Sequence, residues 1–150
     1  MKQFRTLIVC DSPHHGNTRK VADALTEEFP EITVMTINEA RAASLKEYDL
    51  VGLASGIYYG SFSKPLLAYA ETLPRGTAVF TLYTYGIKRD GYVNRLHEIL
   101  RTRGCRIIGS YGCPGYDTFG PLKLVGGISK DHPNATDIRL AASFYEHLKK

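Results

Sequence analysis

Apolar residues along the chain gather in short runs that are rich in β-branched side chains. The runs span residues 4–10, 32–37, 49–55, 77–83 and 106–112. Runs of this length and composition predict β-strands. Those at 49–55 and 77–83 are apolar on both alternating faces, which is typical of strands covered by other elements on both sides.

Helical periodicity fills the stretches between these runs. Between the first two runs, apolar or small residues recur at spacings of three and four, at Thr18, Val21, Ala22, Leu25 and Phe29. This pattern predicts an amphipathic helix. A second helix is predicted over residues 63–73, because Ser63 is a suitable cap and Pro65 suits a first turn.

Three more helices are expected. Residues 38–48 predict one short helix, and a longer one follows Asp90, a suitable cap. The last helix opens at Pro133 and Asn134. Strands that alternate with helices require crossover connections and therefore a parallel sheet.

The predicted fold is an α/β, doubly wound, three-layer sandwich with a five-stranded parallel sheet of order 2-1-3-4-5. In such sheets ligands bind at the carboxyl ends of the strands. The loops at this edge span 11–18, 55–62, 83–91 and 112–132. The last is long enough to predict a lid or rim over a bound ligand.

Composition narrows the class of protein. The 150 residues are 43% hydrophobic and 23% charged, which predicts one globular domain over 1–150. The net charge of +4 comes from dispersed basic residues, which favours solubility over steering of anionic partners and gives little support for nucleic-acid binding.

Three cysteines without zinc or disulfide spacing indicate free thiols in a reducing compartment. The first residues lack a signal-peptide layout, and no apolar stretch approaches the ~18 residues of a membrane span. A cytoplasmic protein without a membrane span or metal site is expected.

The loop after the first predicted strand is a candidate anion site. It contains Ser12, Gly16, Asn17 and Thr18 where a helix is about to begin. The first amides of a helix lack partners within the helix, and they carry the positive end of its dipole. Capping of the helix by Asn17 or Thr18 is the plainer alternative, although it leaves two adjacent histidines and a glycine unexplained.

Several anion-binding classes lack their signatures here. The sequence has neither GxxxxGK[ST] nor GxGxxG, which argues against P-loop hydrolases and dinucleotide binding. Gly16 occupies the place of the arginine that small tyrosine phosphatases need after Cys10. A receiver domain would need an acidic pair after the first strand, where only Asp11 is present, and an aspartate at the end of the third, where Ser55 stands.

Four loop sequences, in order, resemble those of the flavodoxin family. They are SPHHGNT, ASGIYYGSFSKPL, TLYTYG and the run CPGYDTFGPLKLVGGISKDHPNATD. The resemblance covers nearly the whole chain. It implies a flavodoxin-like fold, noncovalent FMN, and one- or two-electron transfer between a reductase and acceptor proteins.

The resemblance also implies site residues. Those assigned to the FMN phosphate are Ser12, His14, His15, Gly16, Asn17 and Thr18. The histidines depart from the hydroxyls that simple flavodoxins use there. The flavin ring needs stacking partners and backbone donors, and the candidates are Ser55, Gly56, Ile57, Tyr58, Tyr59, Gly60, Thr84, Tyr85, Gly86 and Tyr116.

Alternatives remain open at this stage. Either Tyr58 or Tyr59 is expected to stack on the flavin, and Tyr85 is a candidate for the second face. A reactive thiol at Cys113 is less favoured, because no positive group adjoins it in the sequence. An electron carrier is favoured over a small FMN-dependent NAD(P)H:quinone or flavin reductase, since no nicotinamide-binding domain is evident. A flavin-free module that binds another phosphate is the third possibility.

Overall fold

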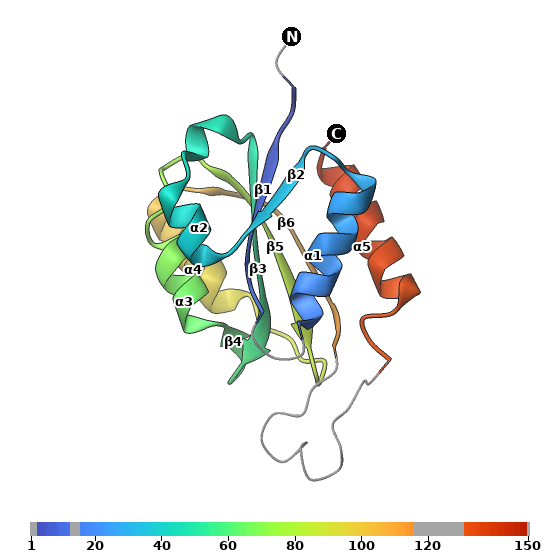
Figure 1. Ribbon diagram of the computed structural model, residues 1–150. Coiled ribbons are helices and arrows are strands. Elements are labelled where there is room, and N and C mark those ends of the chain that lie inside the picture. Colours follow the sequence, from blue (N-terminus) through green and yellow to red (C-terminus); the bar gives the residue numbers. More distant parts are fainter. Residues whose placement is uncertain (1–2, 13–15, 116–130, 150) are drawn as a thin grey trace.

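A parallel sheet forms the centre of the computed structural model, which describes residues 3–12, 16–115 and 131–149 (Figure 1). Its parallel strands are β1 (Thr6–Asp11), β2 (Ile32–Met35), β3 (Leu50–Tyr58), β5 (Ala78–Tyr85) and β6 (Arg106–Pro114). They lie in the order β2-β1-β3-β5-β6. Numbered among themselves, the parallel strands have the predicted order 2-1-3-4-5. A short strand, β4 (Ser61–Phe62), was not predicted and pairs antiparallel with the end of β3.

Helices cover both faces of the sheet, as predicted for three layers (Figure 1). One face carries α1 (Asn17–Glu28) and α5 (Ala135–Leu148), and the other carries α2 (Ile37–Ala42), α3 (Lys64–Ala70) and α4 (Asn94–Arg103). The single helix predicted over 38–48 is wrong, because the chain leaves α2 at Ala43 and then makes a separate 3-10 turn, η1 (Leu45–Glu47). No helix within the described ranges is long and apolar enough to cross a bilayer.

The cap predicted at Ser63 is confirmed, and the last helix opens at Asn134 as predicted. Ser63 caps α3, where its Oγ accepts a hydrogen bond from the Leu66 amide at 3.3 Å. Asn134 caps α5 in a capping box. The cap predicted at Asp90 is wrong, because the chain first makes a turn and α4 begins only after Val93.

Two glycines allow aromatic rings to lie flat on neighbouring strands. A Cβ built on Gly52 in β3 would lie 2.3 Å from the ring of Phe80 in β5. A Cβ on Gly112 in β6 would lie 2.3 Å from the ring of Tyr83. Phe80 packs on the face that carries α1 and α5, and Tyr83 packs on the opposite face. Each face of the sheet therefore depends on one glycine, Gly52 on the face of Phe80 and Gly112 on the face of Tyr83.

Candidate functional site

Loops of the carboxyl edge of the sheet meet at the lower end of Figure 1. The register brings them together, because Asp11 of β1 pairs with Ser55 of β3, and Gly56 pairs with Thr84 of β5. Tyr85 in turn pairs with Pro114 of β6. The ends of four parallel strands thus lie side by side, as the sequence predicted.

The first loop ends where α1 begins, and the backbone of Gly16 and the hydroxyl of Ser12 form the start of this helix. Gly16 has φ of 63° and ψ of 26°, in the left-handed region that favours glycine, and it serves as the N-cap of α1 without a side-chain cap. Ser12 Oγ accepts a hydrogen bond from the Thr18 amide at 3.2 Å. Neither Asn17 nor Thr18 is the N-cap of α1, which is Gly16, so the capping residues named in the plainer alternative are wrong. His14 and His15 lie outside the described residues.

Open space adjoins Gly16. A Cβ built there would meet no atom of the described residues within 4 Å. The amides at the start of α1 face this loop, with the positive end of the helix dipole behind them. A hollow of about 500 Å³ beside Ser12 is lined by Arg19, Arg41 and Asp11. Arg19 forms an ion pair with Asp23 at 2.9 Å. The features of this junction that suit an anion are therefore the helix amides and the Ser12 hydroxyl.

The start of α1 is joined directly to β5. Thr18 Oγ1 and Thr84 Oγ1 are 2.8 Å apart, and both residues are buried. Both hydroxyls were predicted to face a ligand, whereas in the structure they bond to each other. The Thr18 amide is bonded to Ser12, and Thr84 pairs with Gly56 of β3 and Cys113 of β6.

The second loop is largely a continuation of β3. Ser55 is fully buried, and its hydroxyl donates to the Gly56 carbonyl at 2.6 Å and accepts from the Ser63 amide at 3.2 Å. Ile57 pairs with Phe62 of β4 and packs against the core beneath α3 and α4. The Ser55 hydroxyl and the Ile57 side chain therefore face the protein interior.

A tight hairpin places one tyrosine far out at this edge. Tyr58 pairs with Ser61, and the two residues between them, Tyr59 and Gly60, have φ of 52° and 80°. Positive φ at both positions is typical of a two-residue hairpin turn. The side chain of Tyr59 is 90% exposed, whereas the hydroxyl of Tyr58 folds back beside Gly56. Tyr59 is thus the better placed of the two for stacking on a flat ligand.

Aromatic rings gather under the third loop. Tyr85 lies 6.1 Å from both Tyr83 and Tyr92, measured between ring centroids. The hydroxyl of Tyr92 donates to the Ile87 carbonyl, which holds the loop that contains Gly86. Sequence reasoning missed Tyr92. Its only signal was an aromatic residue in a loop at the carboxyl edge.

The end of β6 lies against the first loop. The Gly115 amide donates to the Tyr85 carbonyl at 2.9 Å, and a Cβ on Gly115 would lie 2.7 Å from Asn17 Nδ2. A side chain at position 115 would therefore displace Asn17 from the start of α1. Tyr116, the next predicted contact, lies outside the described residues.

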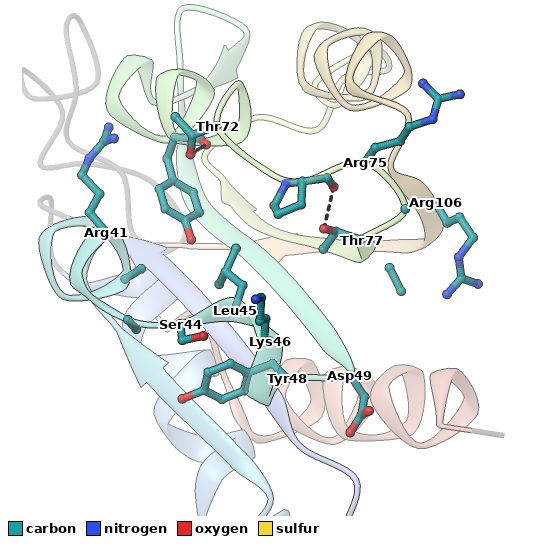
Figure 2. A pocket seen from close by; sticks show the side chains of 16 residues that line it. Arg41, Ser44, Leu45, Lys46, Tyr48, Asp49, Thr72, Arg75, Thr77 and Arg106 are labelled. Carbon is teal, nitrogen blue, oxygen red and sulfur yellow. Dashed lines mark hydrogen bonds between the residues drawn. The ribbon is translucent and has the colours of Figure 1, made fainter.

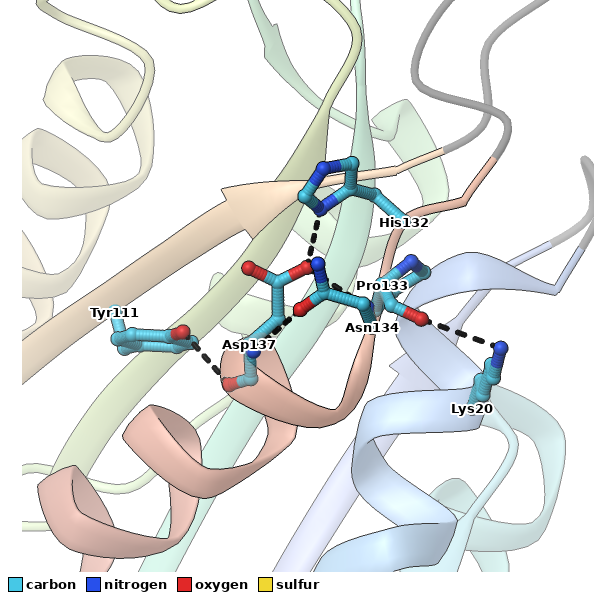
Figure 3. A network of polar contacts seen from close by, with 6 residues as sticks. All are labelled: Lys20, Tyr111, His132, Pro133, Asn134 and Asp137. Carbon is cyan, nitrogen blue, oxygen red and sulfur yellow. Dashed lines mark hydrogen bonds and ion pairs between the residues drawn. The ribbon is translucent and has the colours of Figure 1, made fainter.

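The chain re-enters the described structure at a polar network at the start of α5 (Figure 3). His132 Nδ1 lies 2.5 Å from Asp137 Oδ2, and Asp137 completes the capping box with Asn134. Lys20 of α1 donates to the Pro133 carbonyl at 3.2 Å, and Tyr111 of β6 donates to the Asp137 carbonyl at 2.8 Å. These contacts fix α5 to α1 and β6 beside the candidate site.

All three cysteines are buried and carry free thiols. Burial raises the pKa of Cys113 to about 12, and the nearby Asp137 carboxylate adds to the shift. Burial likewise raises the pKa of Cys10 to about 12. The thiolate is the reactive form of cysteine, so neither residue is suited to nucleophilic chemistry.

The folded protein is therefore expected to resist thiol reagents. With Ellman reagent at mildly alkaline pH, all three thiols should react after denaturation. Over the same time, the native protein should give almost no increase in the absorbance that reports reacted thiols. Rapid reaction of one thiol in the native protein would contradict this expectation and revive Cys113 as a reactive group.

Comparison with known protein families identifies the fold family. A family model described as Flavodoxin domain matches residues 8–89, which is more than half of the chain. The chain belongs to the flavodoxin family. The matched segment of this flavodoxin-family protein contains the first two loops of the site and the beginning of the third.

Similar proteins extend the match over nearly the whole chain. An uncharacterised protein of Methanocaldococcus jannaschii is 30% identical, over 98% of this chain and 99% of its own. Flavodoxin 2 of Bacillus cereus has a similar structure, with a TM-score of 0.70 at 16% identity over 97% of both chains.

Two further solved structures share the fold at low identity. A flavoprotein of Lactobacillus acidophilus, solved in complex with FMN, has a TM-score of 0.58 at 17% identity over 74% of this chain and 93% of its own. An NADH:FMN oxidoreductase, EmoB, in its apo form, has a TM-score of 0.62 at 17% identity over 98% of this chain and 89% of its own. The flavodoxin-like fold predicted from the sequence is confirmed.

The residues of the flavodoxin-family site suit a flavin mononucleotide. Open space at Gly16, the Ser12 hydroxyl and the amides of α1 match the needs of a phosphate group. Exposed Tyr59 and the ring of Tyr85 are suitable partners for a flat aromatic ligand.

Proposed function

We propose that this protein binds FMN noncovalently and carries electrons between a reductase and acceptor proteins. The proposal rests on the structure of the junction between β1 and α1. There a Cβ on Gly16 would meet no atom of the described residues within 4 Å, and the Thr18 amide is held by Ser12. Membership of the flavodoxin family supports the choice of FMN over other phosphates.

Each part of the cofactor has candidate partners. The phosphate would be held by Ser12 and the amides that begin α1. Backbone groups at Gly56, Gly60 and Gly86 would meet the polar edges of the ring, and Tyr59 would cover one face. His14, His15 and Tyr116 remain predictions of the sequence. FMN bound in this way would supply one- or two-electron transfer, and the protein would orient the ring and limit its contact with water.

A reductase that takes hydride from NAD(P)H and reduces quinones or flavins is the second candidate. Similarity to the NADH:FMN oxidoreductase EmoB favours it. The carrier is preferred, because the family model that matches the chain is that of a flavodoxin domain. Buried free thiols also fit a reducing cytoplasm, which we propose as the location.

Two measurements test this function. The protein is purified and denatured, and any released chromophore is identified by absorbance and mass; the proposal expects FMN. NADPH is then added to the FMN-loaded protein without oxygen. A carrier keeps its flavin absorbance until a reductase is added, whereas direct bleaching by NADPH would establish the reductase. Absence of FMN after purification and after reconstitution would exclude both.

A further inference from the structure

A second pocket lies at the opposite edge of the sheet from the flavin site (Figure 2). It has a volume of about 690 Å³ and lies at the amino ends of strands, since Asp49 precedes β3, Thr77 precedes β5 and Arg106 begins β6. The turn η1 and the end of α2 close its other side. Nothing in the proposed electron transfer uses this pocket.

Its charge is strongly one-sided. Four cationic side chains line it, from Arg41, Lys46, Arg75 and Arg106, against the single carboxylate of Asp49. None of the four has a carboxylate within 4 Å among the described residues. The Asp49 carboxylate is engaged elsewhere, because it accepts a hydrogen bond from the Arg5 amide at 2.9 Å. Among the described residues, the pocket therefore gathers more positive than negative charge.

A buried hydroxyl in the wall of this pocket also lacks a partner. Tyr69 of α3 lines the pocket and is only 2% exposed, yet its hydroxyl makes no hydrogen bond to any described residue. The guanidinium of Arg41 lies 5.7 Å from the centre of the Tyr69 ring. A buried polar group without a partner destabilises the folded state, and an added acceptor relieves that cost.

The cationic groups surround the pocket on two sides. Figure 2 shows Lys46 in the middle of the pocket, Arg41 at one side, and Arg75 and Arg106 at the other with their guanidinium groups directed outward. Arginine pairs with planar or tetrahedral oxyanions through paired hydrogen bonds, and lysine does so as a point charge. Separate cations on opposite sides suit a ligand with more than one anionic group.

We propose that this pocket binds a small polyanion with at least two phosphate or carboxylate groups, held by Arg41, Lys46, Arg75 and Arg106, with the Tyr69 hydroxyl as an additional donor. The ligand is a small molecule rather than an electron-transfer partner. The pocket lies at the amino ends of the strands and the flavin edge at their carboxyl ends, and Arg41 is the one described residue that lines both this pocket and the hollow beside Ser12.

The test is isothermal titration of the full chain with pyrophosphate, citrate and ADP, each used separately. FMN is kept in excess so that it occupies the anion site of α1. The titrations are repeated on Ser12→Asp, in which that site is blocked, so binding of a probe in either experiment cannot be due to it. The result therefore does not depend on whether FMN binds. Saturable, one-site binding of at least one probe is expected, weaker at higher salt. The probe that binds best distinguishes phosphate from carboxylate as the natural group.

Matched variants locate the site. Lys46→Gln combined with Arg106→Gln should weaken binding at least about tenfold, since each removes a charged hydrogen bond. Arg101→Gln combined with Arg139→Gln removes the same charge from α4 and α5 and should change binding less than about twofold. Tyr69→Phe should weaken binding roughly fivefold, and its thermal midpoint without ligand should equal or exceed that of the parent.

Three results would overturn the proposal. They are the absence of saturable binding for every probe, equal weakening by the two charge-matched pairs, and unchanged affinity in a folded Tyr69→Phe protein. Binding of a single-stranded oligonucleotide when none of the small anions binds would also overturn it, because the surface would then recognise a polymer. Thermal midpoints of all variants confirm that each is folded.

Discussion

Replacing Ser12 with aspartate should weaken FMN binding about a hundredfold without unfolding the protein. Ser12 Oγ already accepts the Thr18 amide at 3.2 Å, and an aspartate there keeps an acceptor and adds a charge that suits a helix N-terminus. The same charge repels a phosphate. Two negative charges about 5 Å apart at an effective dielectric constant of about 20 repel by roughly 3 kcal/mol, which corresponds to about a hundredfold loss of affinity.

The measurement is FMN titration followed by quenching of flavin fluorescence, with thermal unfolding of the FMN-free protein alongside. Ser12→Thr, which keeps the hydroxyl, is the matched control and should bind FMN within about threefold of the parent. If Ser12→Asp binds FMN as tightly as the parent, the phosphate does not lie at the start of α1. If the variant unfolds instead, Ser12 is needed for folding, and the FMN affinity of Ser12→Thr is then compared with that of the parent.

Gly52→Ala is expected to be among the most destabilising single-methyl changes in this chain. The new Cβ would lie 2.3 Å from the ring of Phe80, which is fully buried and hemmed in by Phe144 and Tyr145 at 6.1 Å between ring centroids. Overpacking of this kind costs about 3 kcal/mol, which lowers the melting temperature by roughly 6–12 °C.

A double-mutant cycle tests the cause of this loss. Phe80→Leu alone creates a cavity and destabilises the protein, but it also makes room for a side chain at position 52. The double variant should therefore be more stable than the sum of the two single changes predicts, by about 1 kcal/mol or more. Additive losses would mean that the Phe80 ring does not restrict position 52, and that the cost of Gly52→Ala arises in the backbone.

The spacing of apolar residues predicted most of the fold, because strands and helices have different periods. The apolar runs became strands, and the stripe from Thr18 to Leu25 became the buried face of α1. The hairpin of β3 and β4 was missed. Ser55, Gly56 and Gly60 have low strand propensity, yet Gly56 pairs with Thr84 and extends the sheet. Tertiary pairing outweighed local preference at this point.

The same extension explains which site residues face inward. In an extended strand Leu53, Ser55 and Ile57 share one face, and that face packs beneath α3 and α4. Thr84 follows Phe80 and Leu82 on the opposite face, so it meets Thr18 of α1. Sequence alone could place these residues at the right edge of the sheet. It could not predict which side chains point into the protein interior, because that depends on where each strand ends.

Contacts between distant segments were also beyond prediction. Tyr92 joins the aromatic group only because α4 returns beside β5, and the cationic pocket forms from four separate segments. Scattered arginines and lysines were interpreted as a general aid to solubility. Their gathering at one edge is visible only once the crossovers are in place.

The most direct test of the central claim compares FMN with riboflavin. The FMN-free protein is titrated with each flavin while fluorescence quenching is recorded. The two ligands share the ring and differ in the phosphate, so the ratio of their affinities measures the anion site at the start of α1. Charged hydrogen bonds from Ser12 and the helix amides should make FMN bind at least about a hundredfold more tightly than riboflavin. Equal affinity for the two flavins, or no binding of either, would contradict the account.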